Sequence, residues 1–398
     1  MKIKRVNKIK FTFWKAVSIL IAVIGIYSLI MRFTKGLGAT THLNDHVPWG
    51  LWIGFDFIGV GLAAAGFTIA ATAHIFNNHK YESIARPAIL TAFIGYMMVV
   101  ALLVIDLGKP ENFWHPLVMW NVHSVMFEIT WCVICYSTVL TIEFAPVLLE
   151  KFKLVKIQKL VKKITIPVII CGVLFSTLHQ SSFGSLYLIV PAKVYPLWYS
   201  SYLPLHFFIS CIAAGLSMII FESYLCARAF NRGLNISILS GLAKGVLTAI
   251  LTGAVLKFAD IASEGKIPLL FSQVPETYAF WFEIIVGTVV PVIILTNHKW
   301  KVNRTGLYFA SIFAISGFIL NRMNVCVTSL VQSSGQHYRP SFEEISITLF
   351  LVLAAMIAFK LTVENFQVFE KEERYSNLVS SKHEILSKNL VFNKQNEC

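Results

Sequence analysis

The stretch Pro48–Phe76, PWGLWIGFDFIGVGLAAAGFTIAATAHIF, decides the fold class of this chain. It is nearly all apolar and rich in glycine and alanine, and its one acid is Asp56. Its length exceeds the ~20 residues that a helix needs to cross the hydrocarbon core of a bilayer. The stretch therefore predicts a transmembrane helix, and it raises the question of why a carboxyl lies near its beginning.

The whole composition supports this interpretation. Hydrophobic residues make up 56% and charged residues 14% of the 398 residues, whereas soluble domains average about 45–50% and about 25%. Helices are expected because the bilayer offers no water to free backbone groups, and the segments lack the alternation of a barrel. We predict an all-α fold, a polytopic integral membrane helix bundle with about ten transmembrane helices. The expected spans are 13–33, 51–76, 86–106, 123–145, 164–180, 204–227, 240–259, 277–296, 305–321 and 344–365.

The two ends of the chain are assigned separately. The apolar run that begins near residue 13 is longer than the h-region of a signal peptide, and no A-x-A site follows it, so we expect a retained first span. We expect a single transmembrane helical domain over residues 1–366, followed by a cytoplasmic polar tail over residues 367–398.

Basic residues predict the orientation. With the N-terminus inside, 26 of the 34 lysines and arginines fall in inner segments and 8 in outer segments or span ends. The positive-inside rule therefore places both termini in the cytoplasm. The net charge of +13 reports this topology; it does not indicate nucleic-acid binding, because the charges lie in short loops and form no single basic face.

Five outer loops are longer than the inner ones and carry tryptophan, proline, tyrosine and histidine. Single aromatic residues often lie at a membrane interface without further function. Five such loops on one face nevertheless favour a platform for an external partner. The loops are 34–50, 107–122, 181–203, 260–276 and 322–343.

Motifs for bound metals and nucleotides are missing from the sequence. Cys132 and Cys135 form a C-x-x-C, but it lies inside an apolar span without a second pair, so we interpret both as buried apolar residues. The sequence contains no P-loop, Rossmann fingerprint or H-E-x-x-H. We therefore expect no metal site, no haem and no iron–sulfur cluster in this chain. Haem stays open as an alternative, because His123, His179 and His206 all lie near outer span ends.

Ionisable side chains inside the spans are the main functional signal. Each costs at least about 2.5–3.5 kcal/mol at mid-depth and marks a candidate site. A buried carboxyl tends to have a raised pKa and can exchange protons near neutral pH. We favour a proton relay from Glu222 through Tyr96 and Glu128 to His179, because the spans hold too few basic residues to pair with every acid. The alternative is that each acid pairs with a hydrogen-bond donor or a base. Lys257 and Arg322 are the nearest bases. The set comprises Asp56, Tyr96, Glu128, His179, Glu222 and Glu283, with Arg86, Asp106 and Glu143 nearer the span ends.

Several long stretches resemble the NrfD-like, or polysulfide-reductase-type, membrane subunits. They are DHVPWGLWIGFDFIGVGLAAAGFTIAATAHIF, DLGKPENFWHPLVMWNVHSVMFEITWC, STLHQSSFGSLYLI, PLWYSSYLPLHFFISCIAAGLSM and GFILNRMNV. The resemblance covers about residues 15–365. It is strongest to one branch, the membrane subunits of hydrogenase-2-type nickel–iron hydrogenases (HybB).

The resemblance implies a quinone-reactive subunit of a respiratory complex in the bacterial inner (cytoplasmic) membrane. Such subunits carry no redox metal, although this branch is often labelled a b-type cytochrome. Electrons pass through a periplasmic iron–sulfur partner with four clusters, and here the hydrogenase large and small subunits would complete the complex. Menaquinone or ubiquinone would be the substrate.

The same resemblance suggests roles for individual residues. Glu128, His179 and Glu222 match motif positions that suit proton transfer or quinone contact, and Tyr96 and Asp56 match more loosely. We therefore expect Glu128, His179, Glu222 and Tyr96 to transfer protons, and Asp56, His179 and Glu128 to line the quinone pocket. His206 and His298 match no site of the family.

Three alternatives remain. The partner could be a molybdoenzyme, such as polysulfide or thiosulfate reductase. A secondary transporter with ten spans would need no partner, but the broken helices at matching places that would favour one are missing from the sequence. A haem cytochrome would show a Soret band.

Overall fold

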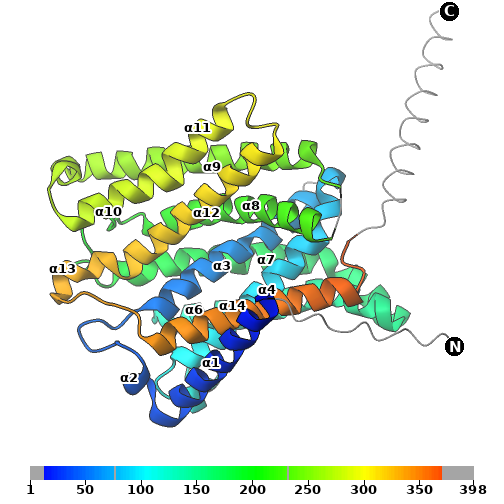
Figure 1. The fold of residues 1–398 in the computed structure, drawn as a ribbon, viewed down its shortest axis with the longest axis horizontal. Helices are drawn as coiled ribbons and strands as arrows, with labels where there is room; N and C mark the ends of the chain where they lie inside the picture. The colour runs from blue at the N-terminus through cyan, green and yellow to red at the C-terminus, as the bar shows by residue number, and fades with distance from the viewer. Residues whose placement is uncertain (1–12, 76–77, 231–232, 370–398) are drawn as a thin grey trace, which may run out of the picture.

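The computed structural model describes residues 13–75, 78–230 and 233–369, and these form helices joined by loops (Figure 1). Within these ranges, β-structure is limited to an isolated bridge between Asn44 and Val47. Ten helical segments are long and apolar enough to cross a membrane, as predicted. They are α1 (Phe13–Lys35), α3 (Leu51–Ala70), α4 (Glu82–Asp106), α6 (Val125–Phe152), α7 (Val155–Leu188), α8 (Leu203–Ala229), α9 (Ile236–Ser263), α10 (Pro275–Ile284) continued by α11 (Val290–Thr296), α12 (Arg304–Cys326) continued by α13 (Val331–Ser334), and α14 (Phe342–Asn365).

Short helical turns complete the described chain. Two of them are π-helical, and the others are single α or 3-10 turns in the connections. They are α2 (Leu37–Thr40), η1 (Ala71–Ile75), η2 (His79–Tyr81), η3 (Pro110–Asn112), α5 (His115–Val118), η4 (Ile267–Phe271), η5 (Ile285–Val289) and η6 (Thr328–Leu330).

The longer connections gather at one end of the bundle, which we call the loop-rich end (left in Figure 1). They join α1 to α3, α4 to α6, α7 to α8, α9 to α10 and α12 to α14. These five connections are those that the sequence predicted to share a face. The remaining connections lie at the opposite end and are short; α6 and α7, for example, are separated by Lys153 and Leu154 alone.

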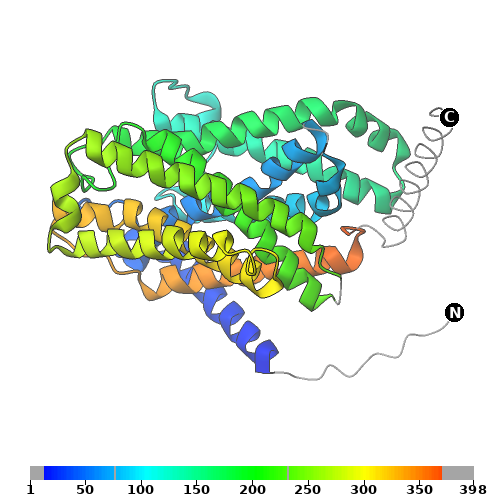
Figure 2. The same ribbon diagram turned by 90° about the horizontal axis from the view of Figure 1, so that it is seen from above.

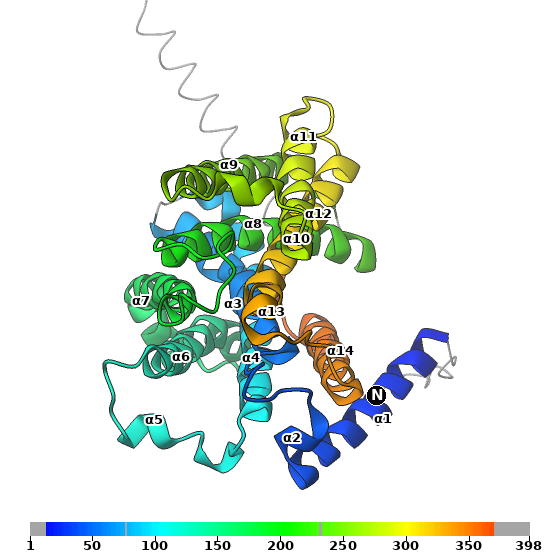
Figure 3. The same ribbon diagram turned by 90° about the vertical axis from the view of Figure 1, so that its left-hand side faces the viewer.

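The helices fall into two groups that meet mainly where α8 packs on α3 and α7 (Figure 3). The first group contains α3, α4, α6 and α7, and the second contains α8, α9, α10 with α11, and α12. Helix α14 packs on α1 and α4 beside the first group. Figure 2 shows the N-terminal part of α1 extending away from the bundle, and Phe13 and Trp14 there are exposed. This edge is suited to contact with lipid.

A buried arginine fastens α1 to the first group. The guanidinium of Arg32 is 1% exposed, and it donates from Nε to the Ile105 carbonyl at 2.8 Å and from Nη2 to the Leu107 carbonyl at 2.6 Å. These carbonyls belong to the C-terminal end of α4, where backbone acceptors lack partners within the helix and a cation is favourable. These carbonyls accept the hydrogen bonds of the arginine, and the Asp106 carboxyl lies within electrostatic range of it.

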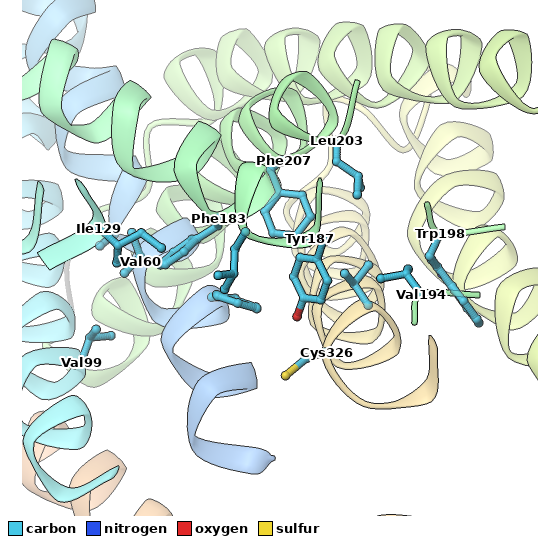
Figure 4. Close-up of a cluster of buried hydrophobic side chains, with 14 of the residues drawn as sticks. Val60, Val99, Ile129, Phe183, Tyr187, Val194, Trp198, Leu203, Phe207 and Cys326 are labelled. Carbon is cyan, nitrogen blue, oxygen red and sulfur yellow. The ribbon is translucent and has the colours of Figure 1, made fainter. Parts of the chain in front are cut away.

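The predicted end of the fifth span is wrong. The sequence placed 181–203 in a loop, whereas α7 continues to Leu188. The continuation is buried, because Phe183 and Tyr187 pack within the largest apolar cluster, which Figure 4 shows around Phe207 and Cys326. Gly184 permits this packing, since a Cβ there would lie 2.4 Å from the backbone nitrogen of Pro204. The predicted tail, 367–398, lies outside the described residues after residue 369.

Candidate functional site

Two predicted residues, Tyr96 and His179, meet between α4 and α7. The hydroxyl oxygen of Tyr96 lies 2.6 Å from Nδ1 of His179, and neither side chain is exposed. Phe183, one turn further along α7, packs on the imidazole with ring centroids 4.5 Å apart. The other imidazole nitrogen, Nε2, forms no hydrogen bond to the described residues. The imidazole therefore has one nitrogen engaged by a phenol and one buried nitrogen without a partner among the described residues.

Glu128 lies in the first turn of α6, at the loop-rich end, and its side chain is exposed. It accepts a hydrogen bond from the Ser182 hydroxyl at 2.7 Å. Ser182 follows His179 by one helical turn of α7, so the carboxylate lies on the loop-rich side of the imidazole. The structure thus places His179 directly against Tyr96 and Glu128 beyond it, which differs from the predicted order of Tyr96, Glu128 and His179. Helix orientation decides this order, because a sequence does not show which faces of α4 and α7 meet.

Asp56 is 2% exposed within α3, and its Oδ1 has no hydrogen-bond partner among the described residues. It lies within electrostatic range of Tyr96 and Asp106. The next residue, Phe57, packs on Phe183 with ring centroids 4.5 Å apart, so α3 contacts the same phenylalanine that packs on His179. The question raised by the sequence has a structural answer: Asp56 faces the interior of the first group.

The start of the helix that carries Asp56 is held by a phenol. Tyr338, in the connection before α14, donates a hydrogen bond to the Glu344 carboxylate and accepts one from the Leu51 amide at 2.8 Å. Burial, and then the bond to Glu344, raise the pKa of the Tyr338 phenol above its usual value of about 10. The hydroxyl therefore stays neutral and keeps its proton for Glu344. Leu51 begins α3, so this contact sets where Asp56 lies.

Glu222 is buried in α8 on the side away from the loop-rich end. Its two carboxyl oxygens form no hydrogen bond to the described residues, and the Thr91 side chain of α4 lies next to it. Tyr96 lies five residues further along α4, a rise of about 7–8 Å. The structure therefore brings Glu222 to the same helix as Tyr96 but does not place the two in contact.

The sequence did not single out a polar stripe between α6 and α7. Tyr136 and Ser176 lie next to each other, and the Tyr136 ring contacts the Tyr96 ring at 4.9 Å between centroids. Glu143 is near Tyr136, and its Oε1 lies 3.6 Å from the position that a Cβ on Gly172 would take. Tyr136 and Glu143 are seven residues apart, which puts them on one helix face. That spacing was the signal available in the sequence.

Glu283, in contrast, is fully satisfied by its neighbours in the second group. Lys257 donates to its carboxylate at 2.7 Å, and the pair lies at the loop-rich end of α9 and α10. The alternative prediction, that an acid inside a span is paired with a base, therefore holds for Glu283. Further donors to the same carboxylate are Asn321 at 2.8 Å, Trp198 at 2.9 Å and Asn324 at 3.0 Å.

The other expected base, Arg322, binds neutral groups. It is 1% exposed and donates to Asn321 Oδ1 at 2.6 Å, the Ser210 hydroxyl at 2.8 Å and the Phe207 carbonyl at 3.1 Å. Its guanidinium carbon lies 3.7 Å from the Phe207 ring centroid. None of these hydrogen bonds joins Arg322 to an acid, so it leaves Asp56 and Glu222 unpaired.

The three histidines considered for haem lie in different surroundings. His179 is bonded to Tyr96 in the first group, and His206 of α8 lies 3.8 Å from the Asp260 carboxylate in the second. His123 is exposed in the loop before α6. These positions do not suit two axial ligands of one haem. Across the described ranges, no three or more histidine, cysteine, aspartate or glutamate side chains form a group that could hold a metal.

Comparison with known proteins gives a consistent result. Residues 39–333 match the family described as polysulphide reductase, NrfD. A protein of Nitratidesulfovibrio vulgaris is 36% identical over 383 residues, which cover 93% of this chain and 98% of that protein. The probable Ni/Fe-hydrogenase 2 b-type cytochrome subunit of Escherichia coli is 31% identical over 339 residues, 83% of this chain and 86% of the relative. The integral membrane subunit of the N. vulgaris menaquinone reductase is 27% identical over 397 residues, 93% and 94% of the two chains.

Proposed function

The chain belongs to the NrfD family of polysulphide reductase membrane subunits, as its motifs predicted, and on this basis we propose that it is the quinone-reactive membrane subunit of a respiratory nickel–iron hydrogenase complex. Oxidation of hydrogen releases two electrons and two protons in the hydrogenase subunits. The electrons pass through a periplasmic iron–sulfur partner with four clusters, and a menaquinone or ubiquinone takes up two electrons and two protons to become the quinol. The chain alone would have no redox turnover. Its place is the bacterial inner membrane, with both termini in the cytoplasm.

The Tyr96–His179 hydrogen bond is the observation that carries the proposal. A phenol and an imidazole that share one proton 2.6 Å apart, inside a helix bundle, can pass that proton from one heavy atom to the other. The free Nε2 of His179 and the unpartnered Oδ1 of Asp56 then remain for the quinone headgroup. Glu128 lies beyond them at the loop-rich end, and we assign it to quinone contact and proton exchange there.

Glu222 is the proposed entry for protons from the cytoplasmic side. A buried carboxyl with two unpartnered oxygens is suited to hold a proton and to hydrogen-bond with water. The gap along α4 from Thr91 to Tyr96 would be crossed by water. Moving one charge across the bilayer corresponds to about 2.3 kcal/mol per 100 mV, so such a route would couple quinone reduction to the membrane potential.

The partner would dock on the loop-rich end. The connection between α4 and α6 exposes a run of large apolar side chains, with Trp120 66% exposed and Val122 68% exposed. Contiguous exposed apolar surface of this kind marks interaction sites. The rest of the run comprises Phe113, Trp114, Leu117, Val118 and Met119.

The test combines purification with two activity assays. The tagged chain, isolated from its native membranes in mild detergent, should bring nickel–iron hydrogenase subunits and an iron–sulfur protein with it. In that complex, Glu128→Gln and His179→Ala should abolish hydrogen oxidation linked to quinone and leave dye-linked oxidation intact. His298→Ala, at an exposed histidine of the opposite end, is the matched control. Recovery of a molybdoenzyme in place of hydrogenase, or unchanged quinone-linked rates in both variants, would overturn the assignment.

A further inference from the structure

A cavity of about 130 Å³ lies within the second helix group, between α8, α9, α10 with η5, and α12. Its wall includes His206, Asp260 and Lys257 near the loop-rich end, with Trp198 from the connection before α8. The residues assigned above to proton transfer do not line it. The cavity is therefore separate from the Tyr96–His179 site.

The polar part of the wall has a hydrogen-bond acceptor and a hydrogen-bond donor that the protein's own groups do not fully use. Asp260 is about nine-tenths buried, and its Oδ1 forms no hydrogen bond to the described residues. Its other oxygen is 3.8 Å from Nε2 of His206. Lys257, three residues before it on the same face of α9, directs one N–H to Glu283 at 2.7 Å and has two more to give.

The rest of the wall is shaped for a flat apolar molecule. Phe207 and Phe318, whose rings both lie against the Arg322 guanidinium, border the cavity on one side. Small residues of α9, among them Gly253 and Ala254, leave room beside them. The π-helical turn η5 brings Gly287 to the wall. A Cβ on Gly317 would lie 1.9 Å from the Gly287 Cα, so α12 and η5 touch only because both residues are glycine. Such π-turns are frequent at functional sites.

Beyond this cavity, the buried polar side chains of α8 and α12 include Ser217 and Ser311, whose hydroxyls bond to carbonyls of their own helices. Toward the opposite end, α8, α9 and α12 pack through an apolar cluster that includes Leu216, Ile219, Leu242, Val246 and Ala310. Glu222 of α8 is turned toward Thr91 of α4. This apolar cluster would block a proton route across the membrane. It is consistent with a binding pocket that opens in the loop-rich half.

We propose that this cavity is a second binding site for a quinol or quinone headgroup; the identification of the ligand class rests on the function proposed above. A quinol hydroxyl can donate to Asp260 Oδ1 and accept from Lys257 Nζ at the same time, while its ring lies against the small residues of α9. A purely apolar molecule would leave Asp260 Oδ1 without a donor, which is costly in a buried site. The site lies at the same end of the bundle as the first one, within reach of the same partner face.

Photolabelling tests the proposal on the intact complex. An azido-menaquinone analogue is bound to the purified complex and activated by light, and labelled peptides are identified by mass spectrometry. We expect labels on α9 and α12 as well as on α3 and α7, and excess menaquinone should remove both. Ala254→Leu, which fills the cavity, should lower the α9 and α12 labelling at least tenfold and leave the α3 and α7 labelling unchanged. Val255→Leu, on the exposed face of α9, should change neither.

The outcomes separate the two proposals. Labels on α3 and α7 alone, or α9 labels that persist with excess menaquinone or in Ala254→Leu, would overturn the second site and leave the first. Labels on α9 and α12 alone would support the second site and overturn the quinone role of Asp56. Absence of labels on all four helices would overturn both. Should Ala254→Leu fail to assemble with its partners, competition on the unmodified complex still decides the question.

Discussion

The hydroxyl of Tyr96 and Nδ1 of His179 are 2.6 Å apart, although the two residues are 83 positions apart in the sequence. The pair joins α4 to α7 at a point where both helices are buried. The geometry makes the phenol and the imidazole one proton-exchanging unit, because either oxygen or nitrogen can hold the shared proton.

Tyr96→Phe tests that unit. The variant keeps the ring and its contact with Tyr136 but removes the hydroxyl, so quinone-linked turnover should fall about 100-fold, the lower range for loss of a general acid or base. Dye-linked hydrogen oxidation should be unchanged. Steady-state rates with hydrogen and a soluble quinone measure the effect. Tyr278→Phe, at an exposed tyrosine of α10, is the control, and equal rates for both variants would refute the role of the hydroxyl.

Glu222→Gln should slow proton uptake from the cytoplasmic side. Because no described residue bonds to its carboxyl oxygens, the amide breaks no ion pair and the fold should be retained. The complex is reconstituted into liposomes, and a pH-sensitive dye reports proton uptake during quinone reduction. Uptake should fall at least tenfold, in line with loss of a proton-transfer group.

The control for this experiment is Glu364→Gln, since Glu364 is exposed near the end of α14 and paired only weakly with Lys360 at 3.8 Å. Normal uptake in Glu222→Gln would show that protons enter elsewhere, and the Glu143–Tyr136 stripe would then be the next route to test.

Lys257 and Glu283 should stabilise the folded protein only when both are present. Removing one partner leaves a buried charge without its counter-ion, which costs about 3–5 kcal/mol, whereas removing both costs much less. Lys257→Met and Glu283→Gln should therefore each lower the melting temperature of the detergent-solubilised protein, and the double variant should recover much of the loss. A double variant whose loss equals the sum of the two single losses would show that the charges do not interact.

Tyr338 should make the stability sensitive to alkaline pH. Burial, then the bond to Glu344, raise the pKa of its phenol above the unfolded value of about 10. The stabilisation from the neutral hydroxyl is thus complete below pH ~10 and is lost as the pH rises toward the higher folded pKa. Tyr338→Phe removes this contribution and takes the phenol donor from Oε1 of Glu344, whose Oε2 still accepts from the Ser341 amide, so it should cost about 1–3 kcal/mol at pH 7.

Melting temperatures between pH 7 and pH 11 measure this effect. The gap between the natural protein and Tyr338→Phe should be constant up to pH ~10 and should narrow above it. Tyr202→Phe, at an exposed tyrosine, should match the natural protein throughout. A gap that widens with alkaline pH would contradict the assignment.

Much of the fold was predictable because each span must by itself be long and apolar enough to cross the lipid bilayer. The sequence predicted ten long apolar segments, five longer connections on one side and the family. The structure and the comparisons confirm these predictions. The end of α7 was not, because the serines and Gly184 that follow Gln180 disfavour a helix locally, and the segment stays helical through the burial of Phe183 and Tyr187. The close approach of Gly287, in the π-turn η5, to Gly317 of α12 was also not predictable, since it is a contact between two helical segments.

The sequence predicted which residues are unusual at their depth more accurately than it predicted the contacts between them. Asp56, Tyr96, Glu128, His179 and Glu222 were recognisable because an ionisable group in a span is costly wherever it lies. Their proton-transfer and quinone roles stay predictions. That His179 meets Tyr96, and that Glu283 is tied to Lys257, depends on contacts between helices far apart in the chain.

The sequence by itself therefore determined that this protein crosses a membrane about ten times, that its family is NrfD, and which side chains are unusual at their depth. The tertiary structure alone decided which of those side chains are paired, which keep a free oxygen or nitrogen, and that His206, Asp260 and Lys257 line a cavity in the second helix group. The physical reason is that hydropathy depends on the composition of one helix, whereas a hydrogen bond or a cavity depends on how several helices are rotated and packed against one another.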